Sequence, residues 1–470
     1  MGILNRIGIR PAARLAPIRE GTFIVAGVRV WNPGEAVSAP VNVEIAGGTV
    51  TRVAASGDPA QDEFAGCTVT PGFTDMHVHL PPDNALRLTP LMSLLYLSHG
   101  VTSIRDAGDL DGTSIDAARR LQDAGQVPVP RLSYCGPFVV GGKPTFSNSI
   151  VLQSPDEAAG AARRVRALGA TFLKSYDGLS LAMIRALDVA CAREGLKIMG
   201  HVPADLSYED ARVQEVQHFF GCPEPATLDK PLLPNRTLDW HAVDDARMQF
   251  LVDTTMKHGI ANTPTMVMVK SMLSYENFEE AAESRMAKLM PPFYREVVWH
   301  PDYGRINARV SPEYLKRRGH EALRKKQQLT RLLFEAGAPV YVGTDTAQPF
   351  LVPGASLLDE FRLFVEAGIG ITDVWKLATQ AAGERLGVPG LGRVSENAPA
   401  DLLIFKSDPS RSVPDPEQLV GVVAAGRLYR KRDLDRAIRN YLDFYESPIV
   451  RRMANRAVKQ VLAKLFDRAA

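Results

Sequence analysis

The feature that most constrains the fold of this sequence is a series of short apolar runs between residues 72 and 345, several of them separated by helical patterns. The runs that we interpret as strands are GFTDMHVH (72–79), VTSIRDA (101–107), RLSYCGPFVV (131–140), TFLKSY (171–176), LKIMGHV (196–202), VQEVQHF (213–219), GIANTPTMV (259–267) and PVYVGTD (339–345). Eight strands with helical crossovers predict an α/β fold, a (β/α)₈ TIM barrel over residues 71–390. A doubly wound sheet is the alternative, but no GxGxxG sequence opens any of the helices.

Both ends of the chain flank this barrel with β-type patterns. Residues 1–70 contain alternating runs broken by NPG and AGG, and residues 391–430 contain similar runs broken by Gly and Pro. Neither piece holds enough apolar surface to form a stable sheet alone. We therefore predict one small composite β-sandwich domain built from both segments.

Two further segments are predicted to be helical. Residues 270–335 are too long for a simple connection, and we expect an extra helical layer near the barrel mouth, either a lid or a surface helix pair. Residues 431–470 form a basic amphipathic tail. We expect this tail to pack on a neighbouring subunit of a homo-oligomer. An anionic membrane surface and the chain's own barrel are the alternatives.

Composition excludes several classes of protein. The net charge of +2 gives no reason to expect a nucleic-acid partner. No apolar run is long enough to span a membrane, and the N-terminus lacks the apolar core of a secretory signal, so we expect a cytoplasmic protein. The four cysteines are scattered without a CxxC pair, which argues against a disulfide framework and a cysteine zinc site.

Two histidines end the first predicted strand. His77 and His79 are two positions apart, so a strand points both side chains to the same face. In a barrel that face is the interior, and the carboxyl end of the strand is the catalytic mouth. Two imidazoles at this position predict a site for a divalent metal, although an HxH pair also occurs by chance.

Other strands end in groups that match this pair. Lys174 closes the fourth strand, His201 the fifth, His218 the sixth and Asp345 the eighth. A buried ammonium beside metals is costly, but a lysine carboxylated by CO₂ becomes an anionic bridge between two cations. Taken singly, each group also has a structural interpretation: Lys174 could pair with Asp177, and Asp345 could cap the next turn. Six suitable groups on the right strands favour the metal site.

The motifs around these residues resemble the amidohydrolase superfamily, from about Val25 to Leu428. They are PGFTDMHVHL (71–80), GVTSIRDAG (100–108), FLKSYDG (172–178), GLKIMGHVP (195–203), VQEVQHFFG (213–221), GTDT (343–346) and PADLLIFKSDP (399–409). The sequence is most similar to the branch of prolidase-like Xaa-Pro dipeptidases, imidazolonepropionase-like enzymes and hydrolases of aryl amides, carbamates or ureas. It departs from that branch at GGKP (141–144), where GGHG is frequent, and at Leu358, where a His is expected.

The resemblance implies a binuclear metal centre with a fixed ligand set. His77, His79 and Asp345 would hold one metal, and His201 and His218 the other. Lys174, as its N-carboxylate, would bridge them. The expected metal is Zn²⁺, with Co²⁺ or Mn²⁺ as alternatives.

The chemistry expected of such a centre is hydrolysis of a C–N bond in a small hydrophobic molecule. Two cations lower the pKa of a shared water, hydroxide attacks the carbonyl, and Asp345 carries the proton to the leaving amine. Tyr176 is expected to donate to the oxyanion, or else to form part of the wall. Residues expected to contact the substrate are Arg105, Phe138, Phe219, Met266 and Phe350.

Several alternatives stay open at this point. Arg105 would bind a substrate carboxylate, or pair with Asp106 or Asp109. A lactone or phosphotriester hydrolase could use the same metals. A scaffold protein without activity is disfavoured, because all six ligand positions are present.

Overall fold

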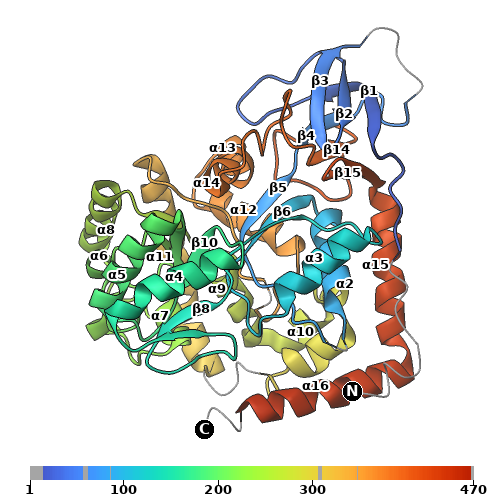
Figure 1. Ribbon diagram of the computed structural model, residues 1–470. Coiled ribbons are helices and arrows are strands. Elements are labelled where there is room, and N and C mark those ends of the chain that lie inside the picture. The colour runs from blue at the N-terminus through green and yellow to red at the C-terminus, as the bar shows by residue number, and fades with distance from the viewer. Residues whose placement is uncertain (1–13, 57–61, 85, 305–309, 347, 467–470) are drawn as a thin grey trace.

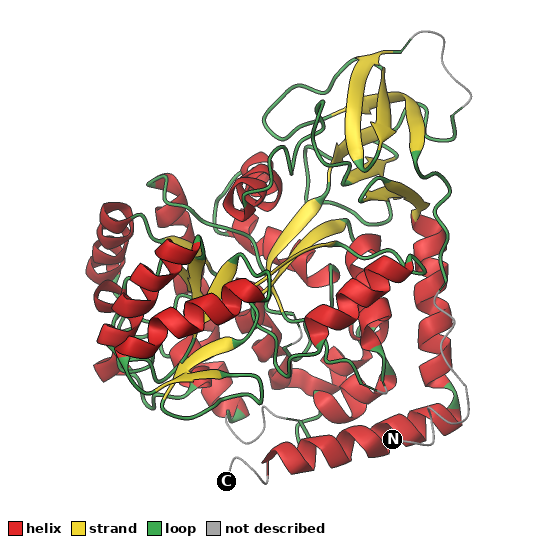
Figure 2. Ribbon diagram, in the orientation of Figure 1, coloured by secondary structure: helices red, strands yellow, loops and turns green. Residues whose placement is uncertain are grey.

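The computed structural model of the protein describes residues 14–56, 62–84, 86–304, 310–346 and 348–466. Parallel strands lie in the middle of an α/β body, a largely antiparallel sheet lies at one end, and two long helices run along the edge of the molecule (Figure 1). Helices surround the strands (Figure 2). The predicted α/β class is therefore confirmed. Within the described residues, none of the helices is long and apolar enough to cross a membrane.

Strands from both ends of the chain pair in one seven-stranded sheet, in the order β16-β15-β14-β4-β1-β2-β3. They are β1 (Thr22–Val30), β2 (Val41–Ala46), β3 (Thr49–Ala55), β4 (Thr68–Pro71), β14 (Leu402–Phe405), β15 (Leu419–Ala424) and β16 (Arg427–Arg430). The antiparallel pair β4–β14 joins the two ends, with Leu402 opposite Pro71. Alternate residues such as Val43, Ile45 and Ile404 form a core of their own. The division of the chain into domains stays a prediction.

The parallel strands fall into two sheets. A three-stranded sheet contains β5 (Phe73–Val78), β6 (Val101–Asp106) and β7 (Arg131–Tyr134). A six-stranded sheet has the order β13-β12-β11-β10-β8-β9, with β8 (Phe138–Gly141), β9 (Ile150–Leu152), β10 (Phe172–Ser175), β11 (Lys197–Gly200), β12 (Glu215–Gln217) and β13 (Ala261–Thr263). Apart from the edge strand β9, neighbours follow chain order without the reversal that defines a doubly wound sheet.

Residues 340–346 connect the two sheets. Val340 forms a parallel bridge with Asn262 of β13, and Thr346 forms one with Val78 of β5. At the other edges, β7 pairs with β6 and β8 pairs with β10, and residues 135–137 separate β7 from β8. The predicted closed barrel stays a prediction, because these strands belong to two separate sheets.

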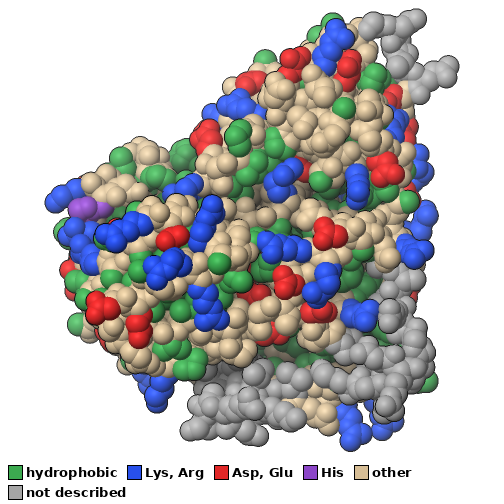
Figure 3. Space-filling model, in the orientation of Figure 1, with side chains coloured by type: hydrophobic (Ala, Val, Ile, Leu, Met, Phe, Trp, Pro, Cys, Tyr) green, Lys and Arg blue, Asp and Glu red, His purple; other side chains and the backbone are tan. Residues whose placement is uncertain are grey.

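Helices follow most of the strands and cover their outer side. They are α2 (Leu88–Ser98), α3 (Ser114–Ala124), η1 (Pro155–Glu157), α4 (Ala158–Ala167), α5 (Leu181–Glu194), α6 (Tyr208–Ala211), η2 (Pro225–Thr227), α7 (Leu233–Leu238), α8 (Asp245–His258), α12 (Ala355–Glu366), α13 (Ile371–Lys376), η6 (Leu377–Ala381) and α14 (Ala382–Leu386). Their ends carry the expected caps: Ser180 accepts a hydrogen bond from the N–H of Met183 at the start of α5, and Gly195 ends that helix with a left-handed residue. Basic and acidic side chains are interspersed over the face drawn in Figure 3.

The segment predicted as a helical layer is helical. It contains α9 (Met266–Leu273), η3 (Ser274–Asn277), α10 (Phe278–Glu283), η4 (Ala287–Leu289), η5 (Tyr294–Val298) and α11 (Pro312–Glu335). The long helix α11 packs against α9 and α12. A role as a lid stays a prediction.

The tail forms two helices, α15 (Lys431–Glu446) and α16 (Pro448–Phe466). The apolar stripe of α15 is buried against α2 of the same chain, and the hydroxyls of Tyr441 and Tyr445 donate to the backbone oxygens of Arg87 and Leu86. The face that we expected to meet a second subunit therefore packs on the chain's own body, which was one of the alternatives. The homo-oligomer stays a prediction.

Candidate metal centre

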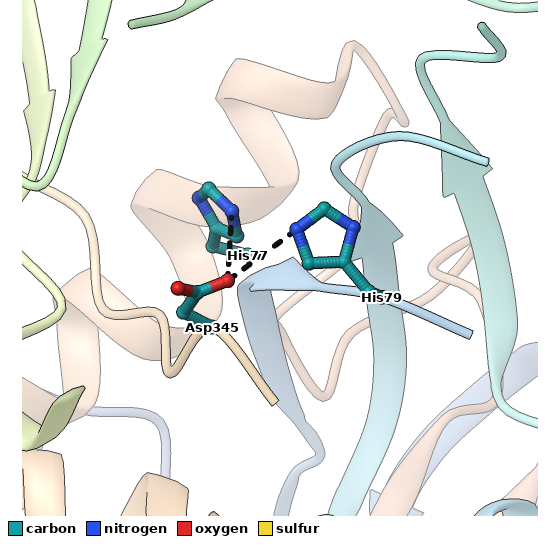
Figure 4. Close-up of side chains that lie close together, drawn as sticks. All are labelled: His77, His79 and Asp345. Atoms are coloured by element: carbon teal, nitrogen blue, oxygen red, sulfur yellow. Dashed lines mark ion pairs between the residues drawn. The ribbon is translucent and has the colours of Figure 1, made fainter. Parts of the chain in front are cut away.

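Two histidines and one aspartate meet at the carboxyl end of β5. His77 lies in β5 and His79 directly follows it, so both side chains leave the strand on the same side. The Nε2 atoms of His77 and His79 lie 3.4 Å and 3.3 Å from the same carboxylate oxygen of Asp345. The three side chains point toward one another (Figure 4), and one ligand atom of each lies within 4.8 Å of the others. This geometry fits a divalent cation.

Lys174, His201 and His218 complete the cluster from the neighbouring strands. Lys174 lies in β10, and the two histidines directly follow β11 and β12. The ring of His218 lies 4.6 Å from that of His77 and 5.2 Å from that of His201. Lys174 is fully buried, and its charge lowers the pKa values of both His77 and His201. The four histidine rings and Asp345 therefore form one cluster.

A chain of hydrogen bonds fixes the ring of His77. Arg105 and Arg385 both donate to Glu215, and although burial raises the pKa of this carboxyl, the two guanidinium groups hold it well below its usual range. An ionised carboxylate can only accept, so the amide nitrogen of Gln217 must face Glu215, at 3.0 Å. The amide oxygen of Gln217 then faces Nδ1 of His77, at 2.5 Å.

The consequence is a defined tautomer. Because an amide oxygen accepts, Nδ1 of His77 carries the proton and Nε2 offers its lone pair toward Asp345. His79 is held in the same way, since its Nδ1 lies 3.0 Å from the backbone oxygen of Gly108. For His218, Nδ1 lies 2.6 Å from the hydroxyl of Thr265, which donates its own proton to the backbone oxygen of Pro264.

His77 and His218 thus turn Nε2 lone pairs toward one buried space, and Nε2 of His79 lies 3.3 Å from a carboxylate oxygen of Asp345. In the part of the chain that the structure describes, Nε2 of His77, Nδ1 of His201 and Nζ of Lys174 are buried without a hydrogen-bond partner. Burial lowers the pKa of His77 well below its usual value and that of His218 to about 3, so both rings are neutral. Neutral imidazoles without partners are the donors that a divalent cation requires.

Burial also acts on the pKa values of the acid and the amine of the centre, Asp345 and Lys174. Burial raises the pKa of Asp345, but the interactions with His218 and His79 outweigh this and lower it, so the carboxylate is ionised. Burial lowers the pKa of Lys174 to about 8. A larger share of this lysine is therefore a neutral amine at physiological pH than for an exposed lysine.

Backbone strain is concentrated at this cluster. His218 and Asp345 have φ angles of 62° and 63°, in the left-handed region that is unfavourable for residues with a side chain. The strained His218 is held by Lys326 of α11, whose buried amine donates to its backbone oxygen at 2.9 Å. The helical layer 266–335 therefore contacts the centre directly.

Aromatic side chains form the wall beside the cluster. Tyr176 lies 4.2 Å from the ring of His201, and Phe138 stacks on His79 at 5.8 Å. Both also pack with Phe146. Two adjacent phenylalanines follow β12. Phe220 faces His201 and His218, whereas Phe219 packs on Trp240.

Four residues expected to contact the substrate lie elsewhere. Phe219 is fully buried against Trp240, as just described. Met266 is fully buried at the start of α9, and Phe350 packs with Tyr275, Phe278 and Trp299 of the helical layer. We expected these residues to face the substrate because they lie near the ends of predicted strands. Beyond the end of a strand, however, alternation no longer sets the direction of a side chain.

Arg105 is the fourth of these residues. We expected it to bind a substrate carboxylate, but the structure gives it other partners. Its side chain is fully buried between the strands and donates to Glu215 and to the backbone oxygen of Met76. Its partner is therefore neither Asp106 nor Asp109. Likewise Asp177 pairs with Arg236 at 2.6 Å and leaves Lys174 free of that contact.

Sequence reasoning missed the residues that orient the histidines. Glu215 and Gln217 are polar residues two positions apart on an apolar strand, the same signal that identified His77 and His79. Thr265 and Lys326 carry no comparable signal, because they reach His218 from α9 and α11 through tertiary packing.

Comparison with known proteins agrees with this arrangement. A sequence profile described as the amidohydrolase family matches residues 68–429. None of the curated proteins matches the chain in sequence.

Among solved structures, the protein is similar to bottromycin amidohydrolase, with a TM-score of 0.71 at 24% identity over 93% of this chain and 94% of that one. A putative prolidase from Bifidobacterium longum has a TM-score of 0.62 at 21% identity, over 90% of this chain and 99% of that one. The ochratoxinase of A. niger has a TM-score of 0.60 at 16% identity, over 88% of this chain and 96% of that one. These likenesses establish a shared fold.

Proposed function

Because this chain belongs to the amidohydrolase family, we propose that it is a binuclear metal-dependent hydrolase that cleaves a C–N bond of a small apolar molecule. Hydrolysis of C–N bonds is the activity of the family, and the metal number and the substrate are our proposals. The observation that carries them is the cluster of His77, His79 and the ionised Asp345, together with Nε2 of His77 and the amine of Lys174, which are buried without a hydrogen-bond partner among the described residues.

The proposed ligand set divides into two halves. His77, His79 and Asp345 would hold one divalent ion, and His201 and His218 the second. We expect Zn²⁺, since neutral imidazole and carboxylate suit it, with Co²⁺ or Mn²⁺ as substitutes. When bound, two such ions polarise a carbonyl group and lower the pKa of water.

Lys174 would bridge the two ions as an N-carboxylate. Its neutral amine attacks CO₂, a new N–C bond forms, and one proton leaves to solvent, so the product is an anion. The lowered pKa of about 8 makes the neutral amine more available than in an exposed lysine. The carboxylate would remove the cost of a buried cation between two other cations.

The remaining steps belong to side chains of this chain. Asp345, ionised and within 3.4 Å of two Nε2 atoms, would take up a proton at its carboxylate and release it to the leaving amine. Tyr176 lies against His201 and would donate its hydroxyl proton to the oxyanion.

The aromatic wall supports an apolar substrate. Phe138, Phe146 and Tyr176 form a buried cluster beside His79 and His201, suited to a hydrophobic or aromatic group next to the scissile bond. Similar structures include a Xaa-Pro dipeptidase, an ochratoxinase and a molinate hydrolase. We therefore place amides, carbamates and dipeptides with an apolar group first among the substrates to be tested.

We also propose that the parallel strands close into a barrel. The segment 340–346 bridges β5 and β13, and the strand 131–141, interrupted at residues 135–137, pairs with β6 through its first half and with β10 through its second. The seven-stranded sheet would then be a separate domain built from residues 1–70 and 391–430.

Metal analysis combined with a hydrolysis screen tests the function. Purified protein should contain two divalent ions per chain, and a panel of N-acyl amino acids, Xaa-Pro dipeptides, aryl carbamates and phenylureas should include a substrate. Hydrolysis of lactones or phosphotriesters, with no cleavage of any C–N bond in the panel, would contradict the proposal. Full activity after exhaustive removal of metal would contradict it as well.

A further inference from the structure

A cavity of about 510 Å³ lies at the end of the strands opposite the histidine cluster. Lys197 is the first residue of β11, whose last residue leads into His201, and Tyr341 lies near the start of the segment that ends with Asp345. Lys197 and Tyr341 both line the cavity, together with Arg385 of α14. Lys197 begins β11, whereas His201 follows its end, so the cavity is distinct from the metal centre.

The wall of this cavity carries a surplus of positive charge. Nε of Arg385 donates to Glu215 at 2.8 Å, the amine of Lys197 donates to the backbone oxygen of Arg385 at 2.5 Å, and both charged groups lie over the ring of Phe172. Glu215 is already paired with Arg105, which donates to both of its oxygens. Among the described residues that line the cavity, the one acid is Glu384, which is exposed.

The two cations also have donors to spare. Nη2 of Arg385 is buried without a hydrogen-bond partner among the described residues, and an ammonium group has three N–H donors. Burial lowers the pKa of Lys197, and the charge of Arg385 lowers it further. An anion in the cavity would accept from the ammonium of Lys197 and reduce the repulsion between the two cations.

The rest of the lining is apolar and aromatic, and includes Phe334, Val340 and Leu377. A hydrocarbon or aromatic body fits such a wall, and two cations offset in part by Glu384 match a single negative charge better than a polyphosphate. We propose that this cavity binds a small organic carboxylate, with the carboxylate between Lys197 and Arg385 and the apolar body against Phe334 and Leu377. The cluster of Arg105, Arg385 and Glu215 therefore lies beside an open cavity and is not enclosed on all sides.

Calorimetric titration of the metal-loaded enzyme with benzoate tests this site. Lys197→Met should weaken binding of benzoate at least about tenfold, because one charge-assisted hydrogen bond is lost. Lys197→Arg, which keeps the charge, should stay close to the wild type. Lys288→Met, at an exposed lysine that pairs with Glu283, is the matched control and should leave affinity unchanged.

A carboxylate could also bind at the metal centre, and the variants separate the two sites. Lys197→Met leaves the centre intact, so equal affinity for benzoate in this variant and the wild type would overturn the proposal. Absence of measurable binding to the wild type would overturn it too. Leu377→Trp, which fills the cavity without removing a charge, should abolish the same binding event even if Lys197→Met does not fold. Benzyl alcohol, the uncharged analogue, should bind more weakly than benzoate.

Discussion

Nδ1 of His77 lies 2.5 Å from the amide oxygen of Gln217, a residue 140 positions further along the chain. The amide nitrogen of the same glutamine donates to Glu215, whose charge is fixed by Arg105 and Arg385. The orientation of the amide follows from this pairing, and the tautomer of His77 follows from the amide. A buried ion cluster in the interior of the strands thus decides which nitrogen of a candidate ligand is free to bind metal.

Replacement of Gln217 by Met should therefore weaken metal binding without changing a ligand. Loss of the partner of a metal-binding histidine typically costs about 10–100-fold in affinity. Competition with a chelator measures the affinity directly. Gln214→Met is the matched control. This side chain directly precedes β12 and hydrogen-bonds to the N–H of Ile198 in β11 and to Asp188 in α5. Equal metal affinity in both variants would show that the hydrogen bond does not orient the ring.

Alanine at any of His77, His79, His201, His218 or Asp345 should remove activity and metal together. Turnover should fall by more than the roughly 100-fold that is typical when a residue hydrogen-bonded to a metal ligand is replaced. Turnover and metal content of each variant give the result, and His258→Ala, at an exposed histidine that ends α8, is the control. Addition of Zn²⁺, Co²⁺ or Mn²⁺ should restore the chelated wild type. A variant that keeps full turnover marks a residue outside the centre.

Lys174→Ala should lose metal and activity, and short carboxylic acids should partly restore both by occupying the bridge. Wild-type protein reconstituted with metal in CO₂-free buffer should likewise regain activity only when bicarbonate is supplied. Full metal occupancy with an unmodified Lys174 amine would contradict the proposed carboxylation. The Lys326→Met variant is not a suitable control here, because Lys326 holds the backbone of His218.

Tyr176→Phe should separate the two proposed roles of this tyrosine. If its hydroxyl donates to the oxyanion, kcat should fall by about 10²–10³ with little change in KM. A side chain that serves as wall alone should alter KM and leave kcat nearly intact, as we expect for Phe138→Leu beside it. Steady-state kinetics on the best substrate of the screen distinguishes these outcomes.

His99 should make the protein less stable in mild acid. It follows α2, and burial lowers its pKa from 6.5 to about 4. Between these two pH values the unfolded chain binds a proton that the folded protein does not, so this histidine makes stability fall as the pH drops from 6.5 to 4. Urea unfolding at pH 5 and pH 8 should show a smaller difference for His99→Asn than for the wild type. An identical difference would mean that His99 titrates alike in both states.

The outer face of α16 offers a test of oligomerisation that leaves the core covered. Ile449 is 74% exposed, and Arg452 and Arg456 are exposed on the same helix. The double variant Ile449→Asp, Arg452→Glu should reduce the mass measured by light scattering if this helix joins subunits. An unchanged mass would contradict an interface at this face. Deletion of residues 431–470 is less informative, because it would also expose the face of α2 that α15 covers.

The sequence by itself determined the parts of this protein that depend on local geometry. Alternation along a strand predicts that His77 and His79 share a face, and the carboxyl ends of parallel strands bring Lys174, His201, His218 and Asp345 to the same edge. The structure brings the four histidines and Asp345 together, and the full set of six ligands stays a prediction. Helical spacing also predicted the layer 270–335 and the helical tail, because an amphipathic period is a property of neighbouring residues.

Tertiary structure alone decided which distant groups those residues meet. Arg105 pairs with Glu215, 110 positions away, and not with Asp106 beside it. Phe219 packs on Trp240, and α15 covers α2 of the same chain. The period of a strand or helix fixes the side on which a residue emerges. The partner on that side depends on burial, because a charge or an apolar ring removed from water is stabilised only by whatever the rest of the chain packs against it.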